Sequence, residues 1–425
     1  MVDGAASPIN RGLFTYSHKK GLCLRLTTVQ QCGVIFGLSG ALLLAAVIGT
    51  SDPAQSITAA RIAQLPNARQ AAWRDYLDRS IRQNAADRAV LAAELKSAEP
   101  SIPPNGSAAR SMPLDRPADW YASPEARRIA DNIVSFQTPA GGWSKNLNLA
   151  DHARRKGESF APNNLSHFLT PGDFDTPADP QWNYVGTLDN DATTTELQFL
   201  AKVIQNGGAT YQASFLHGVE YLLAAQFPNG GWPQVWPLEG GYHDAITFND
   251  GAVTETLEFL EAVAHGVFSF VPDSVAKSAQ ASVARGVDCI LATQILNPRT
   301  GRRTVWGQQH DALTLEPVAG RNYEPRAECS AESAGITRFL MKLPNPAPNV
   351  IAAVDAAARW FKETAVGPQN WARFYEIGTE RPIFGDRDKS IHDTVSELSA
   401  ERQRGYRWYN PVPQGALDQY AEWRH

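Results

Sequence analysis

The chain has 425 residues, of which 43% are hydrophobic and 20% are charged. This balance is typical of a globular protein and excludes a chain that is disordered throughout. The formal net charge of −5 argues against a broad basic surface, so we exclude nucleic acid as a partner.

The first 55 residues have the parts of an export signal. Lys19, Lys20 and Arg25 precede the uncharged apolar run VIFGLSGALLLAAVIG, and small and turn-forming residues follow it. This order predicts a signal peptide over residues 1–55 and a secreted or periplasmic protein, with an uncleaved membrane anchor as the alternative. The segment carries a net charge of +2, so its removal takes the rest of the chain from −5 to about −7.

Two further segments precede the main domain. Residues 56–97 have apolar side chains at helical spacing, which predicts an N-terminal helical segment. Residues 98–117 are rich in proline and predict a linker. We therefore place the main domain at residues 118–425.

The main domain repeats one helix–turn–helix pattern three times. In each copy two aliphatic residues and then a glutamine close a helical stretch, and a turn rich in glycine or proline ends in tryptophan. The glutamines are Gln137, Gln226 and Gln294, and the tryptophans are Trp143, Trp232 and Trp306. One such unit cannot bury its apolar face alone, so the units must pack against one another. We predict an all-α fold, an α/α toroid of helical hairpins with long loops and a few short β-strands.

Two cysteines lie outside the predicted leader. Cys289 and Cys329 could form a disulfide in an exported protein. Both flanking stretches are also typical of helix faces with buried thiols. We expect free, buried cysteines.

The connections inside the hairpins carry the polar residues of interest. Each connection joins the end of a first helix to the start of a second, so all three lie at the same end of the bundle. Their polar side chains converge there, and a cleft at that rim is the expected site.

The first two connections end in acidic and amide residues immediately before a helix. The first ends in TLDND, with Asp189 and Asn190, and the second ends in TFND, with Asn249 and Asp250. The repeats align Asp189 with Asn249 and Asn190 with Asp250. A single residue of these types is a preferred helix N-cap. Clusters in successive repeats offer the oxygen ligands that suit Ca²⁺, whereas no His and Cys spacing suited to zinc is present.

The third connection and the C-terminal region supply cations and aromatic rings. The stretch GRNYEPRAEC contains Arg321, Tyr323 and Arg326, and later stretches contain Arg381 and Arg387. Acidic residues alternate with the later bases, so a solvated surface of ion pairs is one interpretation. A carbohydrate cleft is the other, in which rings stack on sugar faces and guanidinium groups bind carboxylates.

Five motifs occur in order along the chain: QTPAGGWSKN, TLDNDATTTE, GGWPQVWP with TFNDGA, GRNYEP with SAESAGI, and FYEIGTERPIFGDRD with ERQRGYRWY. Together they resemble the motif series of the family 10 polysaccharide lyases, which are pectate lyases. The similarity extends from about residue 120 to residue 409. It implies an (α/α)₃ toroid that cleaves α-1,4-polygalacturonate by Ca²⁺-assisted β-elimination and releases 4,5-unsaturated oligogalacturonides. We expect a monomer that acts on this anionic polysaccharide and has no membrane contact once the leader is removed.

The resemblance also implies roles for single residues. Asp189 and Asp250 would hold the calcium ion, and Arg321 would be the base that takes the C5 proton. The residues that would bind the substrate are Lys145, Asn190, Arg381 and Arg387. The chain departs from the family pattern directly after the Tyr–Glu pair of GRNYEP, and this leaves Arg326 as a competing candidate for the base.

Three other functions share parts of the pattern. A terpenoid cyclase builds α/α barrels with similar aromatic turns, but an exported chain with an arginine-rich final segment argues against it. A non-catalytic sugar-binding toroid would keep the tryptophans and lack the base. An α/α-toroid glycoside hydrolase would need an acid and a second carboxylate beside the scissile bond. Glu196 and Glu332 are its candidates, and both lie in helical stretches.

Overall fold

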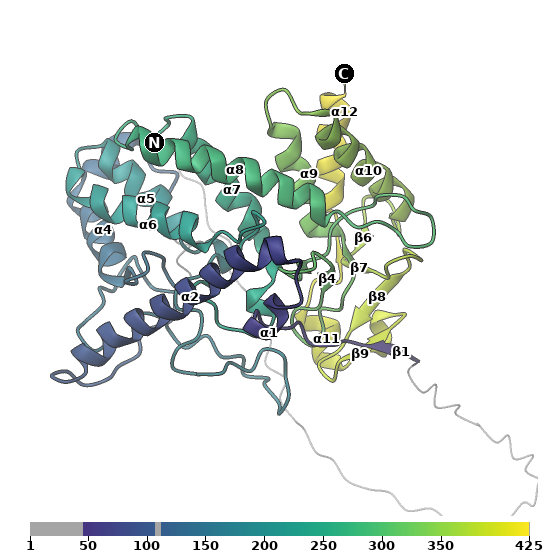
Figure 1. Cartoon of the computed structure of the whole chain (residues 1–425), viewed down its shortest axis with the longest axis horizontal. Coiled ribbons are helices and arrows are strands. Elements are labelled where there is room, and N and C mark those ends of the chain that lie inside the picture. The colour runs from purple at the N-terminus through teal and green to yellow at the C-terminus, as the bar shows by residue number, and fades with distance from the viewer. Residues whose placement is uncertain (1–45, 107–111, 425) are drawn as a thin grey trace, which may run out of the picture. The chain divides into compact units, whose positions relative to one another are not determined.

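The computed structural model describes residues 46–106 and 112–424, so the predicted leader up to residue 45 lies outside the described residues. Helices make up most of the regular structure, with short strands between them (Figure 1). The prediction of an all-α fold with a few short β-strands is confirmed. Within the described ranges, every helix is too short or too polar to cross a membrane.

The three predicted hairpins are present in chain order. They are α4 (Pro124–Phe136) with α5 (Thr194–Gln205), α6 (Gln212–Ala225) with α7 (Ala252–Ala264), and α8 (Asp273–Thr293) with α9 (Ser330–Lys342). Successive hairpins pack on each other, because α5 contacts α6 and α7 contacts α8. Two further helices, α10 (Pro348–Thr364) and α12 (Val412–Trp423), pack against α9 (Figure 1).

The tryptophans fix the turns that follow the first helices. The indole N–H groups of Trp143, Trp232 and Trp306 each donate to a backbone carbonyl of the preceding helix, at 2.7, 2.8 and 2.7 Å. Trp371, after α10, donates to the Phe361 carbonyl in the same way at 2.8 Å. This fourth turn was not predicted from the sequence, because Ala365 follows α10 at the place where the other first helices are followed by their glutamine.

The glutamines tie each turn to the next hairpin. Gln226 Nε2 donates to the carbonyl of Gly230 in its own turn and to the carbonyl of Ser282 in α8, both at 2.9 Å. Gln137 bridges its own turn and α6 through the same two kinds of bond. The repeated glutamine therefore joins neighbouring units of the fold.

Replacing Gln226 by alanine is expected to lower the free energy of unfolding by about 1–3 kcal/mol, because two buried carbonyls, one in the turn and one in α8, lose their donor. Urea denaturation measures this change. The matched control is Gln205→Ala on the exposed end of α5, which should cost less than about 0.5 kcal/mol. Equal costs at the two positions would contradict the bridging role.

The predicted N-terminal helical segment contains α1 (Ala59–Ile62) and the long helix α2 (Asn67–Glu94). The rings of Trp73 and Tyr76 on α2 lie 5.4 and 5.1 Å from the ring of Phe227, in the second tryptophan turn. The segment is therefore packed onto the hairpins rather than separate from them.

The short strands form three small antiparallel sheets. The largest has the order β1–β9–β8–β7–β5, a second pairs β10 with β6, and a third has the order β2–β3–β4. Their bounds are β1 Val47–Thr50, β2 Ile246–Thr247, β3 Gln309–His310, β4 Pro317–Val318, β5 Glu328–Cys329, β6 Trp371–Ala372, β7 Phe374–Tyr375, β8 Pro382–Gly385, β9 Ser390–His392 and β10 Tyr409–Asn410. Strand β1 consists of residues that the sequence analysis placed in the leader. Cys289 and Cys329 are free and buried, as expected.

Candidate active site

The first two hairpin connections end in matching 3₁₀ turns. These are η2 (Asp189–Asp191) and η5 (Asn249–Gly251), and they contact each other. Asn190 and Asp250 occupy the matching positions, with φ angles of 53° and 50°. Asn and Asp adopt this left-handed conformation more readily than most residues with a side chain. The repeat alignment made from the sequence is therefore correct in three dimensions.

Asp189 lies in a buried polar network. Its Oδ2 accepts from Lys145 Nζ at 2.5 Å, and its Oδ1 accepts from Gln234 Nε2 at 2.8 Å and Asn249 Nδ2 at 3.4 Å. Burial by itself would raise the pKa of Asp189, but the nearby Lys145 and Arg321 bring that pKa below its ordinary value. Asp189 therefore stays ionised although its side chain is only 6% exposed.

Asp250 is linked to Asp189 through Asn249, whose Nδ2 also donates to Asp250 Oδ2 at 2.8 Å. Burial, together with the negative charges of Asp189 and Glu332, raises the pKa of Asp250 to about 6. The raised pKa of Asp250 means that its negative charge is not fully compensated, so a cation bound beside it would be stabilised.

Arg321 is held in place by Glu324. Its Nε and Nη2 donate to the two carboxylate oxygens at 3.0 and 2.5 Å, and Tyr406 OH donates to the same carboxylate at 2.9 Å. Burial would raise the pKa of Glu324, but Arg321 lowers that pKa to about 2. Burial would likewise lower the pKa of Arg321, and Glu324 raises it instead. Nη1 donates to none of the described residues, so it is the nitrogen available to a substrate.

These groups line one cavity of about 100 Å³. Its lining residues are Lys145, Tyr184, Asp189, Asn190, Gln234, Tyr242, Asn249, Asp250, Gln308, Gln309, Arg321 and Glu324. The three hairpin connections thus bring five of the seven predicted site residues together. Arg326, the competing base, does not line this cavity, and its 54% exposed side chain pairs with Glu316 at 3.4 Å.

The two other predicted substrate-binding residues lie outside this cavity. Arg381 is 46% exposed and pairs with Asp393 at 2.9 Å. Arg387 Nε pairs with Glu401 at 2.8 Å, and its guanidinium carbon is 5.1 Å from the centre of the Tyr323 ring. Arg387 is therefore close to the segment that carries Arg321. The roles of both arginines stay predictions.

Amide side chains supply the part of the site that sequence analysis missed. The Oε1 atoms of Gln234, Gln308 and Gln309 and the Oδ1 atom of Asn249 are buried and have no hydrogen-bond partner among the described residues. All four residues line the cavity. Gln234 lies in the quoted motif GGWPQVWP, so a signal was present, whereas Gln308 and Gln309 lie in a stretch without any distinguishing pattern.

This donor set fits a calcium ion. In residues 46–106 and 112–424, no three His, Cys, Asp or Glu side chains cluster as metal ligands. Calcium does not require such a cluster, because it binds amide as well as carboxylate oxygens and tolerates irregular geometry. Asp189 and Asp250, with unpaired amide oxygens around the same cavity, are ligands of that kind.

The carboxylates considered for a glycoside hydrolase both have local partners. Glu196 Oε2 accepts from the Thr193 backbone N–H at 2.6 Å and so closes the N-terminal end of α5. Glu332 pairs with Arg373 at 2.5 Å. Neither lines the cavity that contains Arg321, so the two carboxylates named as hydrolase candidates are not part of this site.

Comparisons with known proteins agree with the fold. The family model described as pectic acid lyase matches residues 137–368 and 363–417. No curated protein matches the chain.

Two solved structures of the family 10 polysaccharide lyase from Cellvibrio cellulosa are similar to this chain. One is an aspartate-to-alanine mutant in complex with trigalacturonic acid, with 27% identity and a TM-score of 0.60, covering 75% of this chain and 99% of that one. The other has 28% identity and a TM-score of 0.59, and covers 73% of this chain and 96% of that one. The predicted α/α toroid is thereby confirmed as the fold.

Proposed function

The chain belongs to the pectic acid lyase family, and from that premise we propose that this polysaccharide lyase cleaves α-1,4-polygalacturonate by Ca²⁺-assisted β-elimination, with Arg321 as the base. One observation carries the proposal. Asp189 and Asp250, from the first two hairpin connections, line the same cavity as Arg321 from the third. These three groups can therefore act on a single uronate sugar.

The proposed reaction begins with the C5 proton of a galacturonate residue. A bound Ca²⁺ would neutralise the neighbouring carboxylate and so make that proton more acidic. Arg321 takes the proton through Nη1, the C4–O bond breaks, and a double bond forms between C4 and C5. The departing oxygen takes up a proton and becomes the hydroxyl group of a shortened chain, while Arg321 gives the proton it took to the solvent. The other product is a 4,5-unsaturated sugar, and no water is added.

Lys145 and Asn190 have supporting roles in this proposal. The Lys145 ammonium lies 2.5 Å from Asp189 and 3.3 Å from the centre of the Tyr184 ring, so its position is fixed from two sides. A cation at that place lowers the free energy of charge that develops on the substrate carboxylate. Asn190 lines the same cavity, and its Nδ2 donates to Asn146 Oδ1 at 3.3 Å.

Arg321 is protonated in the resting protein, because Glu324 raises its pKa. A guanidinium cannot accept a proton, so the active form must first lose one. At pH values below the pKa of Arg321, the fraction of this deprotonated form increases about tenfold for each unit by which the pH is raised. We therefore propose an enzyme whose rate increases with pH through the neutral range.

Mass spectrometry of the products tests the reaction class. Polygalacturonate incubated with the enzyme and Ca²⁺ should give oligosaccharides that are lighter by one water than hydrolysis products and absorb in the ultraviolet. Saturated products of the hydrolytic mass would mean a glycoside hydrolase. An unchanged polysaccharide would mean a binding protein, and either result would end the proposal.

Calcium affinity is expected to depend on pH because the pKa of Asp250 is raised to about 6. The carboxylate is ionised and binds fully above that pH, and a proton competes with the metal as the pH falls through it. Affinity should drop about tenfold per pH unit below the pKa. Isothermal titration calorimetry at pH 7 and pH 5 measures this, and Asp250→Asn should bind weakly at both. An affinity that is the same at both pH values would contradict the assignment of Asp250.

Export to the periplasm or the medium also belongs to this proposal. The polysaccharide is too large to enter a cell intact, and the order of charges and apolar residues in the first 55 residues is typical of an export signal. Fractionation of expressing cells, followed by N-terminal sequencing of the exported protein, tests it.

A further inference from the structure

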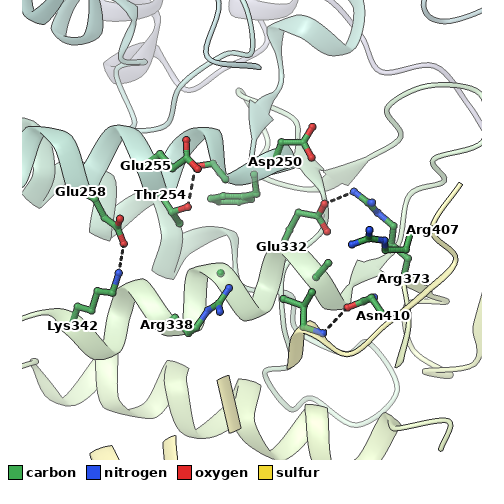
Figure 2. A pocket seen from close by; sticks show the side chains of 15 residues that line it. Asp250, Thr254, Glu255, Glu258, Glu332, Arg338, Lys342, Arg373, Arg407 and Asn410 are labelled. Atoms are coloured by element: carbon green, nitrogen blue, oxygen red, sulfur yellow. Dashed lines mark hydrogen bonds and ion pairs between the residues drawn. The ribbon is translucent and has the colours of Figure 1, made fainter. Parts of the chain in front are cut away.

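A second, larger cavity of about 610 Å³ lies beside the proposed active site (Figure 2). Asp250 lines both cavities, so the two adjoin at this side chain. The larger cavity is a groove between two helix faces. One face is on α7, with Thr254, Glu255 and Glu258, and the other is on α9, with Gly335, Arg338 and Lys342.

The charged side chains along this groove are of two kinds, those with an ion-pair partner and those without one. Lys342 Nζ pairs with Glu258 Oε1 at 2.7 Å and Arg373 pairs with Glu332 at 2.5 Å, so these four charges balance each other. The acids without a cation within ion-pair distance, Asp250 and Glu255, lie at the end nearest the proposed calcium site. That end would be neutralised by a bound cation.

Arg338 and Arg407 remain as charges without partners. Among the described residues, neither guanidinium forms an ion pair within 4.0 Å or a hydrogen bond. Figure 2 shows Arg338 on α9 facing the groove, and Arg407 beside Arg373 on the same side of the groove as Asp250 and Glu332. Guanidinium groups bind carboxylates through two parallel hydrogen bonds, so two free ones in one groove suit a ligand that carries repeated carboxylates.

Gly335 gives a second, independent indication that the groove is kept open. A glycine inside a helix costs about 0.5–1 kcal/mol relative to alanine, so its presence needs a reason. At Gly218 and Gly286 the reason is packing, because an added Cβ would lie 2.6 and 2.5 Å from a leucine side chain. At Gly335 an added Cβ would meet nothing within 4 Å. No neighbour in the protein requires this glycine, but a ligand in the groove would.

We propose that this groove binds further galacturonate residues of the polysaccharide chain that is being cleaved, with Arg338 and Arg407 each receiving a carboxylate. The inference rests on the proposed function for the identity of the chain. Each sugar of polygalacturonate carries one carboxylate, so a chain that leaves the Arg321 cavity along the groove presents its charges in turn to these two arginines. The groove makes the enzyme favour long substrates over short ones.

The test compares kcat/KM on hexagalacturonate with kcat/KM on trigalacturonate. In the double variant Arg338→Ala/Arg407→Ala, the ratio of the two values should fall about tenfold, which is the loss expected for two partly exposed ion pairs. Arg338→Lys/Arg407→Lys should restore part of it, since lysine keeps the charge but not the paired hydrogen bonds. The control is Arg82→Ala, on the exposed face of α2, which should leave the ratio unchanged.

Gly335→Leu tests the space instead of the charge. An added Cβ at this position meets nothing within 4 Å and leucine favours the helix over glycine, so the variant is expected to fold. It should lower the hexamer-to-trimer ratio with both arginines intact. An unchanged ratio in the double variant and in Gly335→Leu would overturn the proposal, and so would an equal loss on both substrates.

The failure of this inference can be told apart from the failure of the proposed function. Binding of hexagalacturonate, measured by calorimetry, does not require turnover. If the wild-type enzyme forms no unsaturated product but its hexamer affinity falls about tenfold in the double variant, the groove assignment stands and the lyase mechanism does not. If turnover occurs and hexamer binding does not change, the reverse holds.

Discussion

Replacing Arg321 by lysine is expected to lower kcat by about 10²- to 10⁴-fold, the range that a positioned general base contributes. The ammonium of lysine can still pair with Glu324, so the buried carboxylate keeps a cation and the fold is preserved. What is lost is the second guanidinium nitrogen, because Arg321 binds Glu324 through Nε and Nη2 and leaves Nη1 for the substrate. Stopped assays of unsaturated product at saturating polygalacturonate measure the change.

Arg326→Lys is the matched control for this experiment. Arg326 lies five residues farther along the same segment, and its exposed guanidinium pairs with Glu316 instead of lining the cavity. Its replacement should alter kcat by less than about twofold. A large loss in Arg326→Lys with full activity in Arg321→Lys would transfer the role of base to Arg326. Circular dichroism and thermal denaturation of both variants exclude unfolding as the cause.

Replacing Asp189 by asparagine is expected to lower kcat/KM by about a hundredfold or more. The proposed calcium site loses a charged ligand, and the negative charge beside Lys145 is removed. The asparagine is nearly the same size and can still accept from Gln234. It carries no charge, however, and leaves Lys145 without its ion-pair partner. Calcium titration of the variant by calorimetry should show weak or no binding, with kcat/KM measured in parallel.

An acid outside the cavity serves as the control for Asp189→Asn. Asp179 is partly exposed, pairs with Arg88 at 2.6 Å and does not line the active-site cavity. Asp179→Asn should therefore retain calcium binding and activity to within about twofold. If Asp189→Asn bound calcium as tightly as the wild type, the metal would have to be placed elsewhere.

The hairpins could be predicted because their signals are local. Each repeat carries its own glutamine, glycines and tryptophan within a few residues, and these residues form contacts mainly inside one turn or with the next helix. The same reasoning explains why the fourth turn escaped detection. Trp371 donates to α10 as the other tryptophans do to their helices, but no glutamine precedes it at the expected place.

The candidate site could be predicted where a motif contained it. Asp189, Asp250 and Arg321 each lie in a quoted motif, and the hairpin topology alone indicated that they would converge. The glutamines of the site could not be found in this way, because Gln308 and Gln309 come to the cavity through pairing of β3 with β2 and β4. Such pairing between two-residue strands leaves no periodic pattern in the sequence.

The last residues of the predicted leader form a strand that was not predicted from the sequence. Residues Val47–Thr50 continue the apolar run, which led us to include them in residues 1–55. In the structure they form β1 and pair with β9, and the Ser51 backbone N–H donates to the Lys389 carbonyl at 2.8 Å. The choice between an apolar leader and an apolar edge strand depends on a partner more than 300 residues away, which composition does not reveal.

The most direct test of the account is the ultraviolet absorbance of unsaturated product when the purified protein meets polygalacturonate, first with Ca²⁺ and then with excess EDTA. The proposal assigns two acids of one cavity to the metal and one arginine to the proton. It therefore predicts that the absorbance rises steadily with Ca²⁺, does not rise with EDTA, and rises again when Ca²⁺ is restored. A rise that is equally fast in EDTA would contradict the metal site. No rise under either condition would contradict the elimination itself.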